Sequence, residues 1–411
     1  MREMKDSGVE WIGQIPKDWI TKRFKYIHRG ANVGESIDKD YWSFDKKDVL
    51  FYTAGATPIN TSYKRFPEWK YTRKTDILLA RNGTPYVYLP VTNSAYSDHI
   101  IRTKINDCYD KRFIAYSLQQ SINSVVVDTV SIATWSISLW DRQYIPVASI
   151  GEQKKIADFL DEKCSEIDSL TSDIQKQIDT LEQYKKSVIT ETVTKGLNPD
   201  AEMKDSGVDW IGDIPSDWET IKIGRLFSIR NERNTKPMDE VQLLSLYTGI
   251  GVFPHGEQEE RGNKAVTVEG YKIVHKNDIV VNIILAWMGA IGISEYDGVT
   301  SPAYDIYVPD TRRVIPHFYH YVFRTKGIAG ECYKYGRGIM LMRWRTYAQE
   351  FKQISVPFPS IETQQEIADY LDKNCSEIDT IISDKKKQLE VIAEYKKSLI
   401  YEYVTGKKEV M

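Results

Sequence analysis

The segment IADFLDEKCSEIDSLTSDIQKQIDTLEQYKKSVITETVT occupies residues 156–194, and IADYLDKNCSEIDTIISDKKKQLEVIAEYKKSLIYEYVT occupies residues 367–405. The two segments are identical at 22 of 39 positions. Neither contains proline or glycine, so each can form one uninterrupted helix of roughly 60 Å at about 1.5 Å per residue. This duplicated long helix therefore determines the overall organisation of the chain.

Apolar residues recur every seven positions in both segments, which is typical of a coiled-coil seam. In the first segment the seam is Leu160, Ile167, Ile174, Leu181 and Val188, with Leu170 and Ile178 in the intermediate turns. In the second it is Leu371, Ile378, Ile392 and Leu399, with Ile381, Leu389 and Tyr395 beside it. Lys385 interrupts the second seam at the position that matches Ile174. Because a helix with one apolar stripe needs a partner, we expect the two helices to pair as an antiparallel coiled coil. The alternatives are that each helix packs on its own globular part or in a homodimer.

A second repeat precedes each globular part. MKDSGVEWIGQIPKDW (residues 4–19, the first box) returns as MKDSGVDWIGDIPSDW (residues 203–218, the second box), with 13 of 16 positions identical. The segments between box and helix share almost no sequence; we call them the first block (residues 20–150) and the second block (residues 219–360). A duplicated frame therefore carries two different inserts. The apolar anchors of the first box predict that it clamps its block to the frame near the end of the second helix: Trp11, Ile12, Ile15 and Trp19.

The blocks are predicted to be mixed α/β. Short β-rich runs such as DVLFYTA, DILLARNG, YVYLPV, DIVVNIIL and AYDIYVP are separated by Gly, Pro and Asn, and KRFIAYSLQQSINSV and HFYHYVFRTKGIAGECY are helical candidates. The predicted fold class is α/β (α+β), with two globular domains joined by two long helices in a pseudo-two-fold repeat. The predicted domains are an N-terminal globular domain with its leading box (1–150), a central helix (151–195), a linker with the second box and the C-terminal globular domain (196–360), and a distal helix (361–411).

Composition indicates a soluble, cytoplasmic protein whose positive charge is local. The chain is 41% hydrophobic and 27% charged, with net charge −3. Residues 20–150 nevertheless carry 18 Lys and Arg against 12 Asp and Glu, and residues 219–360 carry 18 against 15. Basic blocks on an acidic frame favour polyanion binding. The most apolar run, residues 279–293, is too short to span a bilayer and predicts buried strands. The four cysteines lack CxxC spacing, which argues against disulfides or a zinc site, and we expect Cys164 and Cys375 to be buried thiols.

Motifs for catalysis are lacking in the sequence. There is no Gly-rich cofactor turn with an Asn/Asp-Pro-Pro-aromatic loop, as a nucleotide methyltransferase would need, and no phosphate loop for ATP. Asp48 with Glu68-Trp69-Lys70 could be imagined as a nuclease site, but such triplets occur by chance in charged chains. His317 and His320 are three residues apart without a third ligand. We therefore expect no catalytic residue, no metal site and no cofactor bound by this chain.

Basic residues interleaved with aromatics suggest recognition of nucleic acid instead. They occur in TSYKRFPEWKYTRK (61–74), LARNGTPYVY (79–88) and KYGRGIMLMRWRTY (334–347). Such surfaces can follow phosphates, and Arg and Asn can pair with guanine and adenine edges. For any single residue, a solvated basic loop is the alternative. The candidate DNA-binding residues are Tyr63, Lys64, Arg65, Lys70, Arg73, Lys74, Arg81, Asn82, Arg337, Arg343 and Arg345.

The boxes resemble those that introduce each target-recognition domain in specificity (S) subunits of type I restriction–modification enzymes. The block ends VASIGEQKKIADFLDEK (147–163) and VPFPSIETQQEIADYLDK (356–373) are similar to that family too, as is DGVTSPAYDIYVP (297–309). The first block has no clear counterpart of that last segment, only NSAYSDHI. The resemblance covers the frame of the whole chain and is weak within the blocks.

The resemblance implies a non-catalytic DNA sequence-specificity subunit. Each target-recognition domain would bind one half of an asymmetric bipartite site in double-stranded DNA, and the helices would set the spacing. Two copies of a methylation (M) subunit using S-adenosylmethionine would dock on this chain, and a separate restriction (R) subunit would use ATP and Mg. Two alternatives remain open: a coiled-coil scaffold whose blocks bind proteins, and a free-standing DNA nuclease using the Glu68/Lys70 region.

Overall fold

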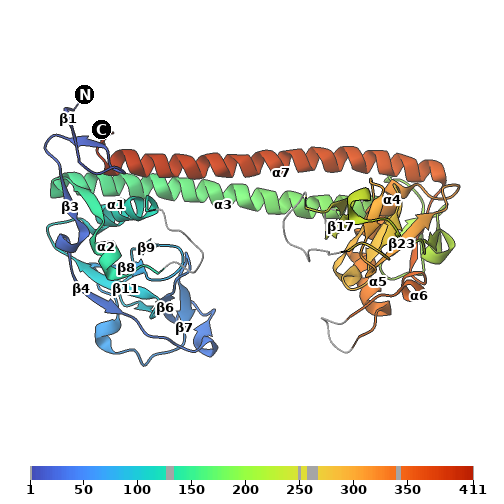
Figure 1. Ribbon diagram of the computed structural model, residues 1–411, viewed down its shortest axis with the longest axis horizontal. Coiled ribbons are helices and arrows are strands. Elements are labelled where there is room, and N and C mark those ends of the chain that lie inside the picture. Colours follow the sequence, from blue (N-terminus) through green and yellow to red (C-terminus); the bar gives the residue numbers. More distant parts are fainter. Residues whose placement is uncertain (1, 126–133, 249–250, 257–266, 339–343, 411) are drawn as a thin grey trace. The chain divides into compact units, whose positions relative to one another are not determined.

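The computed structural model describes residues 2–125, 134–248, 251–256, 267–338 and 344–410. Its two long helices are α3 (Ile150–Lys195) and α7 (Ile361–Val404), as the heptads predict (Figure 1). The chain divides into two units, residues 1–174 with 386–411 (unit 1) and residues 175–385 (unit 2). Each unit therefore holds one box, one block and a part of both helices. Among the described residues, no helix is long and apolar enough to cross a bilayer.

Within each unit the parts of α3 and α7 run antiparallel and are joined by the same ion pair. In unit 1 the Lys396 ammonium lies 2.5 Å from the Asp168 carboxylate. In unit 2 the Lys185 ammonium lies 2.6 Å from the Asp379 carboxylate. Asp168 and Asp379 are equivalent positions of the helix repeat, as are Lys185 and Lys396. The two copies of the helix repeat therefore form the same Lys–Asp contact in both units. Lys385, which replaces the apolar residue of the first copy, donates a hydrogen bond of 2.5 Å to Gln177 of α3.

The buried stripe of the frame lies at heptad positions a and e rather than a and d. Taking Leu160 as position a, Ile178 and Ile382 are at e and are buried, whereas Leu170, Ile381 and Tyr395 are at d and about half exposed. We expected Leu170 to fill the seam and Ile381 and Tyr395 to lie beside it, and their exposure corrects this. At about 100° per residue, position e lies about 40° from position a around the helix and position d about 60° on the other side, so a stripe of a and e leaves d outside. The predicted seam residues Leu160, Ile174, Leu371, Ile378 and Leu399 are buried, and Ile167, Leu181, Val188 and Ile392 are partly buried.

Each box is a small hairpin that packs on a helix end. In the first box, β1 (Met4–Asp6) pairs with β2 (Gln14–Pro16), and in the second, β13 (Met203–Asp205) pairs with β14 (Asp213–Pro215). Ile12, Ile15 and Trp19 share a core with Leu399 and Val404 of α7, which confirms the expected position of the first box near the end of the second helix.

A glycine after each long helix lets the box tryptophan approach closely. Gly406 and Gly196 adopt left-handed φ values of 70° and 76°. A Cβ on Gly406 would lie 3.2 Å from the Trp19 ring and 2.5 Å from Pro16, and one on Gly196 would lie 3.2 Å from the Trp218 ring. Both positions therefore require glycine.

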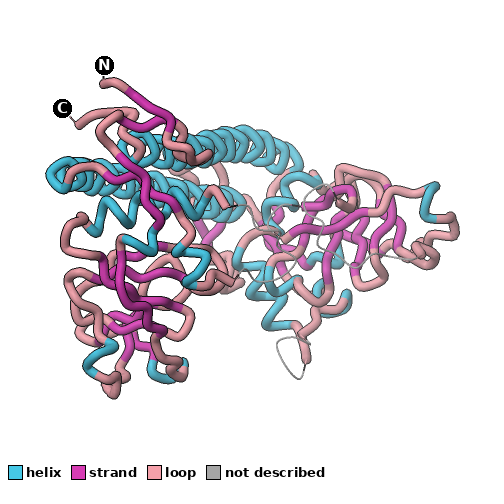
Figure 2. The backbone as a smooth tube through the Cα atoms, turned by 60° about the vertical axis from the view of Figure 1, so that its left-hand side comes forward, coloured by secondary structure: helices cyan, strands magenta, loops and turns pink. Residues whose placement is uncertain are grey.

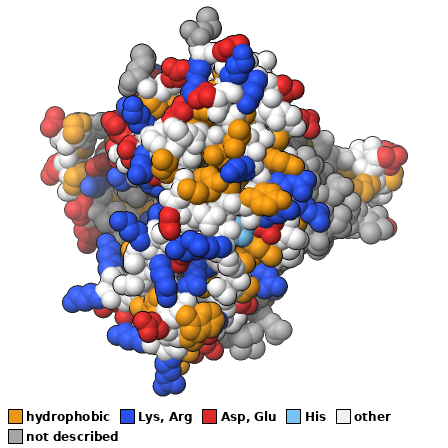
Figure 3. Space-filling model, turned by 90° about the vertical axis from the view of Figure 1, so that its left-hand side faces the viewer, with side chains coloured by type: hydrophobic (Ala, Val, Ile, Leu, Met, Phe, Trp, Pro, Cys, Tyr) orange, Lys and Arg blue, Asp and Glu red, His pale blue; other side chains and the backbone are white. Residues whose placement is uncertain are grey.

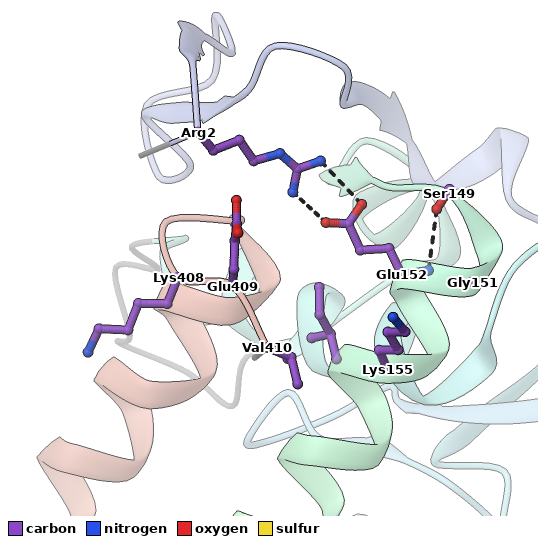
Figure 4. Close-up of a pocket in the computed structure, with 9 residues that line it drawn as sticks. Arg2, Ser149, Gly151, Glu152, Lys155, Lys408, Glu409 and Val410 are labelled. Atoms are coloured by element: carbon purple, nitrogen blue, oxygen red, sulfur yellow. Dashed lines mark hydrogen bonds and ion pairs between the residues drawn. The ribbon is translucent and has the colours of Figure 1, made fainter.

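Unit 1 has an additional polar link at the first box (Figure 4). The Arg2 guanidinium lies 2.6 Å from the Asp18 carboxylate and forms an ion pair with Glu152 in the first turn of α3. The Trp19 indole donates a hydrogen bond of 2.9 Å to the same Glu152 carboxylate. These contacts raise the pKa of Arg2, chiefly through its hydrogen bond to Glu152, and lower that of Asp18. A pocket of about 520 Å³ opens beside them, lined also by Lys155, Lys408 and Val410. The equivalent positions of unit 2 are Ala201 and Thr363, which cannot form this link.

The first block consists of two small sheets and two helices beneath the frame of unit 1 (Figure 2). One sheet has the order β4-β11-β8-β9, with β4 (His28–Val33), β11 (Ile100–Ile105), β8 (Asp76–Ala80) and β9 (Val87–Tyr88). The other has the order β10-β6-β7-β5, with β10 (Ala95–Tyr96), β6 (Val49–Tyr52), β7 (Ile59–Thr61) and β5 (Trp42–Ser43). The helices are α1 (Lys111–Asn123) and α2 (Ile137–Asp141).

The second block repeats the strand order of the first main sheet although its sequence differs. Its main sheet has the order β16-β23-β20-β21, with β16 (Phe227–Ile229), β23 (Tyr304–Pro309), β20 (Ile279–Asn282) and β21 (Ile291–Ile293). The apolar run at residues 279–293 is thus two buried strands, as predicted. Two further antiparallel pairs are β17 (Leu244–Tyr247) with β18 (Gly251–Pro254), and β19 (Lys272–Val274) with β22 (Gly298–Thr300). The single helical candidate of this block is two helices, α4 (Pro316–Phe323) and α5 (Lys326–Tyr335), because Thr325 caps the second; α6 (Ala348–Phe351) follows.

The first and last strands of each block lie side by side. β3 (Ile20–Arg23) pairs antiparallel with β12 (Tyr144–Val147), and β15 (Glu219–Lys222) pairs antiparallel with β24 (Ser355–Phe358). The indole of Trp11 donates to the Tyr144 carbonyl at 3.1 Å, and that of Trp210 donates to the Ser355 carbonyl at 3.2 Å. Both ends of a block therefore meet at its box, and the polypeptide between them can vary without moving the frame.

Two hydrogen bonds join each block to its frame helix in the same way. Gln153 of α3 and Gln364 of α7 are buried and accept the backbone N–H of Asp110 and Ile315, each at 2.9 Å. Eight residues further along each helix, a carboxylate accepts a tyrosine hydroxyl: Tyr116 to Asp161 at 2.8 Å and Tyr321 to Asp372 at 2.6 Å. Burial, followed by these carboxylates, raises the pKa of both tyrosines, so each hydroxyl remains a donor at neutral pH. Cys164 and Cys375 are buried free thiols, as expected.

Candidate nucleic-acid interface

The connection from β7 to β8 places four basic side chains at the surface of the first block. Lys64, Arg65, Arg73 and Lys74 are exposed. On the face of unit 1 that Figure 3 shows, Lys and Arg side chains gather over the lower half, with hydrophobic side chains among them. Such a surface attracts the phosphates of nucleic acid, because each ion pair formed there releases condensed counterions.

Two candidates from the same segment have mainly structural contacts. Lys70 is only 12% exposed, and its ammonium lies 3.0 Å from the Glu35 carboxylate and donates to the Gly34 carbonyl at 3.3 Å. Its charge is already neutralised, which disfavours the phosphate contact that we predicted. Tyr63 is partly buried, with its ring 4.8 Å from that of Phe66 and 5.2 Å from that of Tyr41.

The loop after β8 brings Arg81 and Asn82 together with His99. The Arg81 side chain is exposed, and its guanidinium contacts the Asp98 carbonyl at 3.4 Å. The Asn82 amide lies 2.7 Å from His99 Nδ1. The backbone of the loop is fixed by Trp135, whose N–H donates to the Arg81 carbonyl at 2.6 Å and whose indole donates to the Gly83 carbonyl at 2.7 Å. Arg81 is thus an exposed cation with one long hydrogen bond, to the Asp98 carbonyl, whereas part of the Asn82 amide is occupied.

The equivalent loop of the second block is built differently. The N–H of Thr346 donates to the Ile283 carbonyl after β20 at 2.9 Å, as Trp135 does to Arg81 in the first block. Arg337 and Arg345 pair through their backbones at 2.9 and 3.0 Å. The Arg337 side chain is 68% exposed, lies over the Tyr347 ring and pairs with Glu350 at 2.9 Å. Arg345 is partly buried, and Arg343 lies outside the described residues.

Aromatic rings accompany these arginines, and the sequence reading did not single them out. The Trp344 ring stacks on that of Tyr333 at 5.1 Å, and Trp287 lies 6.0 Å from the same tyrosine. In the first block Tyr26, Tyr41, Trp42, Phe44 and Trp69 are exposed. Stacked and exposed aromatic rings beside cations are the surfaces on which bases or base edges pack. The sequence signal was present in YWSFDKK (41–47), where three aromatic residues are followed by two lysines.

The imagined catalytic and metal arrangements are not formed among the described residues. No group of three or more His, Cys, Asp or Glu that could hold a metal ion occurs there. The Lys70 ammonium is held by Glu35, and Glu68 is exposed. His317 pairs with Glu295 at 3.1 Å, while burial lowers the pKa of His320 to about 3, so that this imidazole is neutral. These contacts give the two histidines structural roles.

The fold and the two loop clusters define a protein with two recognition domains on a duplicated helical frame. Comparisons with known proteins agree with this class. Residues 215–391 match a family model described as the type I restriction modification DNA specificity domain. By this match, the second half of the chain is similar to the DNA specificity domains of type I restriction–modification systems.

Two relatives from Methanocaldococcus jannaschii extend over nearly the whole chain. The specificity subunit of the type I restriction enzyme MjaVIII is 23% identical over 97% of this chain and 94% of its own length. A protein assigned as the specificity subunit of the type I restriction enzyme MjaX is 29% identical over 97% of this chain and 96% of its own length. The similarity is therefore not confined to residues 215–391.

A solved structure shares the fold. It is described as the structural basis of complex assembly and conformational transition of the type I R-M system, and one of its chains superposes with a TM-score of 0.66 at 11% identity. The superposition covers 96% of this chain and 99% of that chain. The predicted mixed fold, with two long helices and two globular parts, is confirmed.

Proposed function

We propose that this chain is the non-catalytic DNA-recognition subunit of a type I restriction–modification complex. Each block binds one half of an asymmetric bipartite site in double-stranded DNA. The observation that carries this proposal is a duplicated frame that holds two blocks of the same topology and different sequence. Because the boxes and helices are duplicated, we expect both blocks to face DNA in equivalent orientations. Because the surfaces of the blocks differ, we expect them to bind different half-sites.

We assign the catalytic steps of the complex to its partner subunits. Methylation of adenine with S-adenosylmethionine belongs to the M subunit, and ATP- and Mg-dependent translocation and cleavage belong to the R subunit. This chain contributes the choice of sequence and the distance between half-sites. The contacts of three candidate groups support the proposal. Lys70 pairs with Glu35, His317 pairs with Glu295, and burial lowers the pKa of His320, which gives each of them a structural role.

DNA binding by the complex of this chain with its M subunit tests the proposal. We expect the logarithm of the affinity to fall linearly with the logarithm of salt concentration, because phosphate contacts release counterions. Replacing Lys64, Arg65, Arg73 and Lys74 together by Glu should weaken binding at least ten-fold and reduce the salt slope, since these side chains are exposed. Binding is measured by fluorescence anisotropy on duplexes with and without the methylated sequence. Binding that ignores both salt and sequence would instead favour a protein scaffold.

An apolar stripe on the frame is the surface that we assign to the M subunit. Leu170 and Tyr395 in unit 1, and Ile381 and Tyr184 in unit 2, are at heptad position d and about half exposed. They are equivalent pairs of the helix repeat. At about 100° per residue, position d lies on the opposite side of the seam from position b, where Asp161 and Asp372 receive the blocks. Each unit thus presents one apolar pair away from its block, which suits two copies of one partner.

Replacing Leu170 and Tyr395 together by Asp is expected to remove one of the two M subunits. Burial of two such side chains at an interface is worth several kcal/mol, so affinity at that copy should fall more than ten-fold. Native mass spectrometry should then show one M subunit per chain, with Ile381 and Tyr184 intact for the other. Ser172→Asp, at an exposed position of α3 in the same unit, is the matched control. Retention of both M subunits by the double variant would contradict this assignment.

A further inference from the structure

The most exposed large side chain of the described residues stands at the end of β5 in the first block. Phe44 is fully exposed, and Trp42 and Tyr41 before it are nearly half exposed. We call residues 41–47 the finger. An isolated aromatic ring in water costs free energy unless a partner covers it, so a cluster of three indicates a binding surface.

The finger is braced by its own hydrogen bonds. Ser43 Oγ accepts the Asp45 N–H at 3.0 Å, and the Asp45 carboxylate accepts the Lys47 N–H at 2.9 Å. β5 is tied to β7 through the pairs Trp42 with Thr61 and Ser43 with Asn60. Phe44 is therefore held outward on a fixed turn.

Charge around the finger selects a polyanion as its partner. Lys39 lies over the Trp42 ring at 5.6 Å, and Lys46 and Lys47 are exposed directly after Phe44. The finger also adjoins the basic connection already described: Ser62 donates its N–H to the Tyr41 carbonyl at 2.9 Å, and Lys64 and Arg65 follow along the chain. Four acidic residues flank Phe44 in sequence, Asp38, Asp40, Asp45 and Asp48. The carboxylates of Asp38 and Asp45 accept the backbone N–H groups of Asp40 and Lys47.

We propose that the finger enters the major groove of DNA at the half-site of the first block, with the Phe44 ring packed on a thymine methyl group. This inference rests on the proposed function. A phenyl ring can neither donate nor accept a hydrogen bond, and the thymine methyl is the apolar feature that base pairs present in the major groove. Lys46 and Lys47 then contact the flanking phosphates. Phe44 thus contributes to the choice of a T·A pair, independently of Arg81.

Deoxyuridine substitution tests the contact, because deoxyuridine differs from thymidine by the methyl group alone. The full chain in complex with its M subunit is titrated with duplexes of the mapped target, in which each thymine of the first half-site is replaced in turn. At one position the wild-type complex should bind about three- to five-fold more weakly, the factor expected for one buried methyl group. The Phe44→Ala complex should bind the thymine duplex as weakly as the wild-type complex binds the deoxyuridine duplex. It should no longer distinguish the two bases.

Controls separate this contact from other effects. Tyr26→Ala removes another exposed aromatic of unit 1 and should keep the wild-type preference for thymine. If Phe44→Ala retains that preference, or if the wild-type complex distinguishes the bases at no position, the inference is overturned while the proposed function stands. If Phe44→Ala instead weakens capture of the M subunit, the finger contacts protein. A wild-type complex without any sequence preference would overturn the proposed function itself.

Discussion

Exchange of residues 20–150 for the corresponding block of another specificity subunit should change one half of the DNA target and leave the other half as it was. The structural reason is that β3 and β12, the first and last strands of the block, pair with each other from Ile20 with Val147 to Arg23 with Tyr144. A foreign block that ends in these strands meets the same box and the same helix. The target sequence is determined by mapping methylated adenines in DNA from cells that contain the chimeric chain and its M subunit.

The junctions of the exchange can be designed from the contacts between block and frame. A donor block should keep a tyrosine at the position of Tyr116, because its hydroxyl donates to Asp161. Tyr116→Phe in the original chain is the matched control: it should lower stability and leave the target unchanged. The reciprocal exchange of residues 219–360 should change the other half only. If either exchange altered both halves, the blocks would not read independently.

Lengthening both helices by one heptad should lengthen the DNA spacer by about three base pairs. Seven residues add about 10 Å of helix, and B-DNA rises about 34 Å per turn of ten base pairs. The insertions belong after Ile174 in α3 and after Lys385 in α7, where the units adjoin along each helix. A whole heptad preserves the a and e pattern, so both ion pairs between Asp and Lys can form as before. Both half-sites should stay the same.

Insertion into α3 alone provides the contrasting variant. It displaces one helix against the other by a heptad, so the pairs Lys396–Asp168 and Lys185–Asp379 can no longer both form. We expect this chain to assemble poorly with its M subunit or to change its spacer. The spacer is measured from the distance between the methylated adenines of the two strands. An unchanged spacer in the doubly lengthened chain would refute the role of the helices as a ruler.

The frame could be predicted from the sequence because its determinants are local and repeated. Seven-residue spacing specifies a helix with one buried stripe, and a duplicated helix supplies its own partner. The side on which burial extends could not be predicted. Ile178 at position e is buried, whereas Leu170 at position d is exposed. That preference comes from tertiary packing, which heptad spacing does not encode.

The common topology of the blocks escaped sequence reasoning for a different reason. Strand order depends on backbone pairing, and many sequences satisfy the pairs between β8 and β11 or between β20 and β23. Gln153 and Gln364 join both blocks to the frame, yet a buried glutamine looks like any polar helix residue until its partner is seen. Lys70 was chosen as a candidate by its neighbours in sequence, whereas its nearest carboxylate, Glu35, is 35 residues away. Placement of the candidate DNA-binding residues at base edges stays a prediction.

The contact between the first box and α7 has a consequence for synthesis on the ribosome. Ile12 accepts a hydrogen bond from Tyr401, which is translated 389 residues later. At about 5–20 residues per second, the first box waits roughly 20–80 s for this partner. The second box, by contrast, packs against Val193 and Gly196, which have just been made. The unit that is begun first is thus completed after the other, and the part of its apolar core that α7 covers, beside Trp19 and Ile15, stays exposed in the meantime.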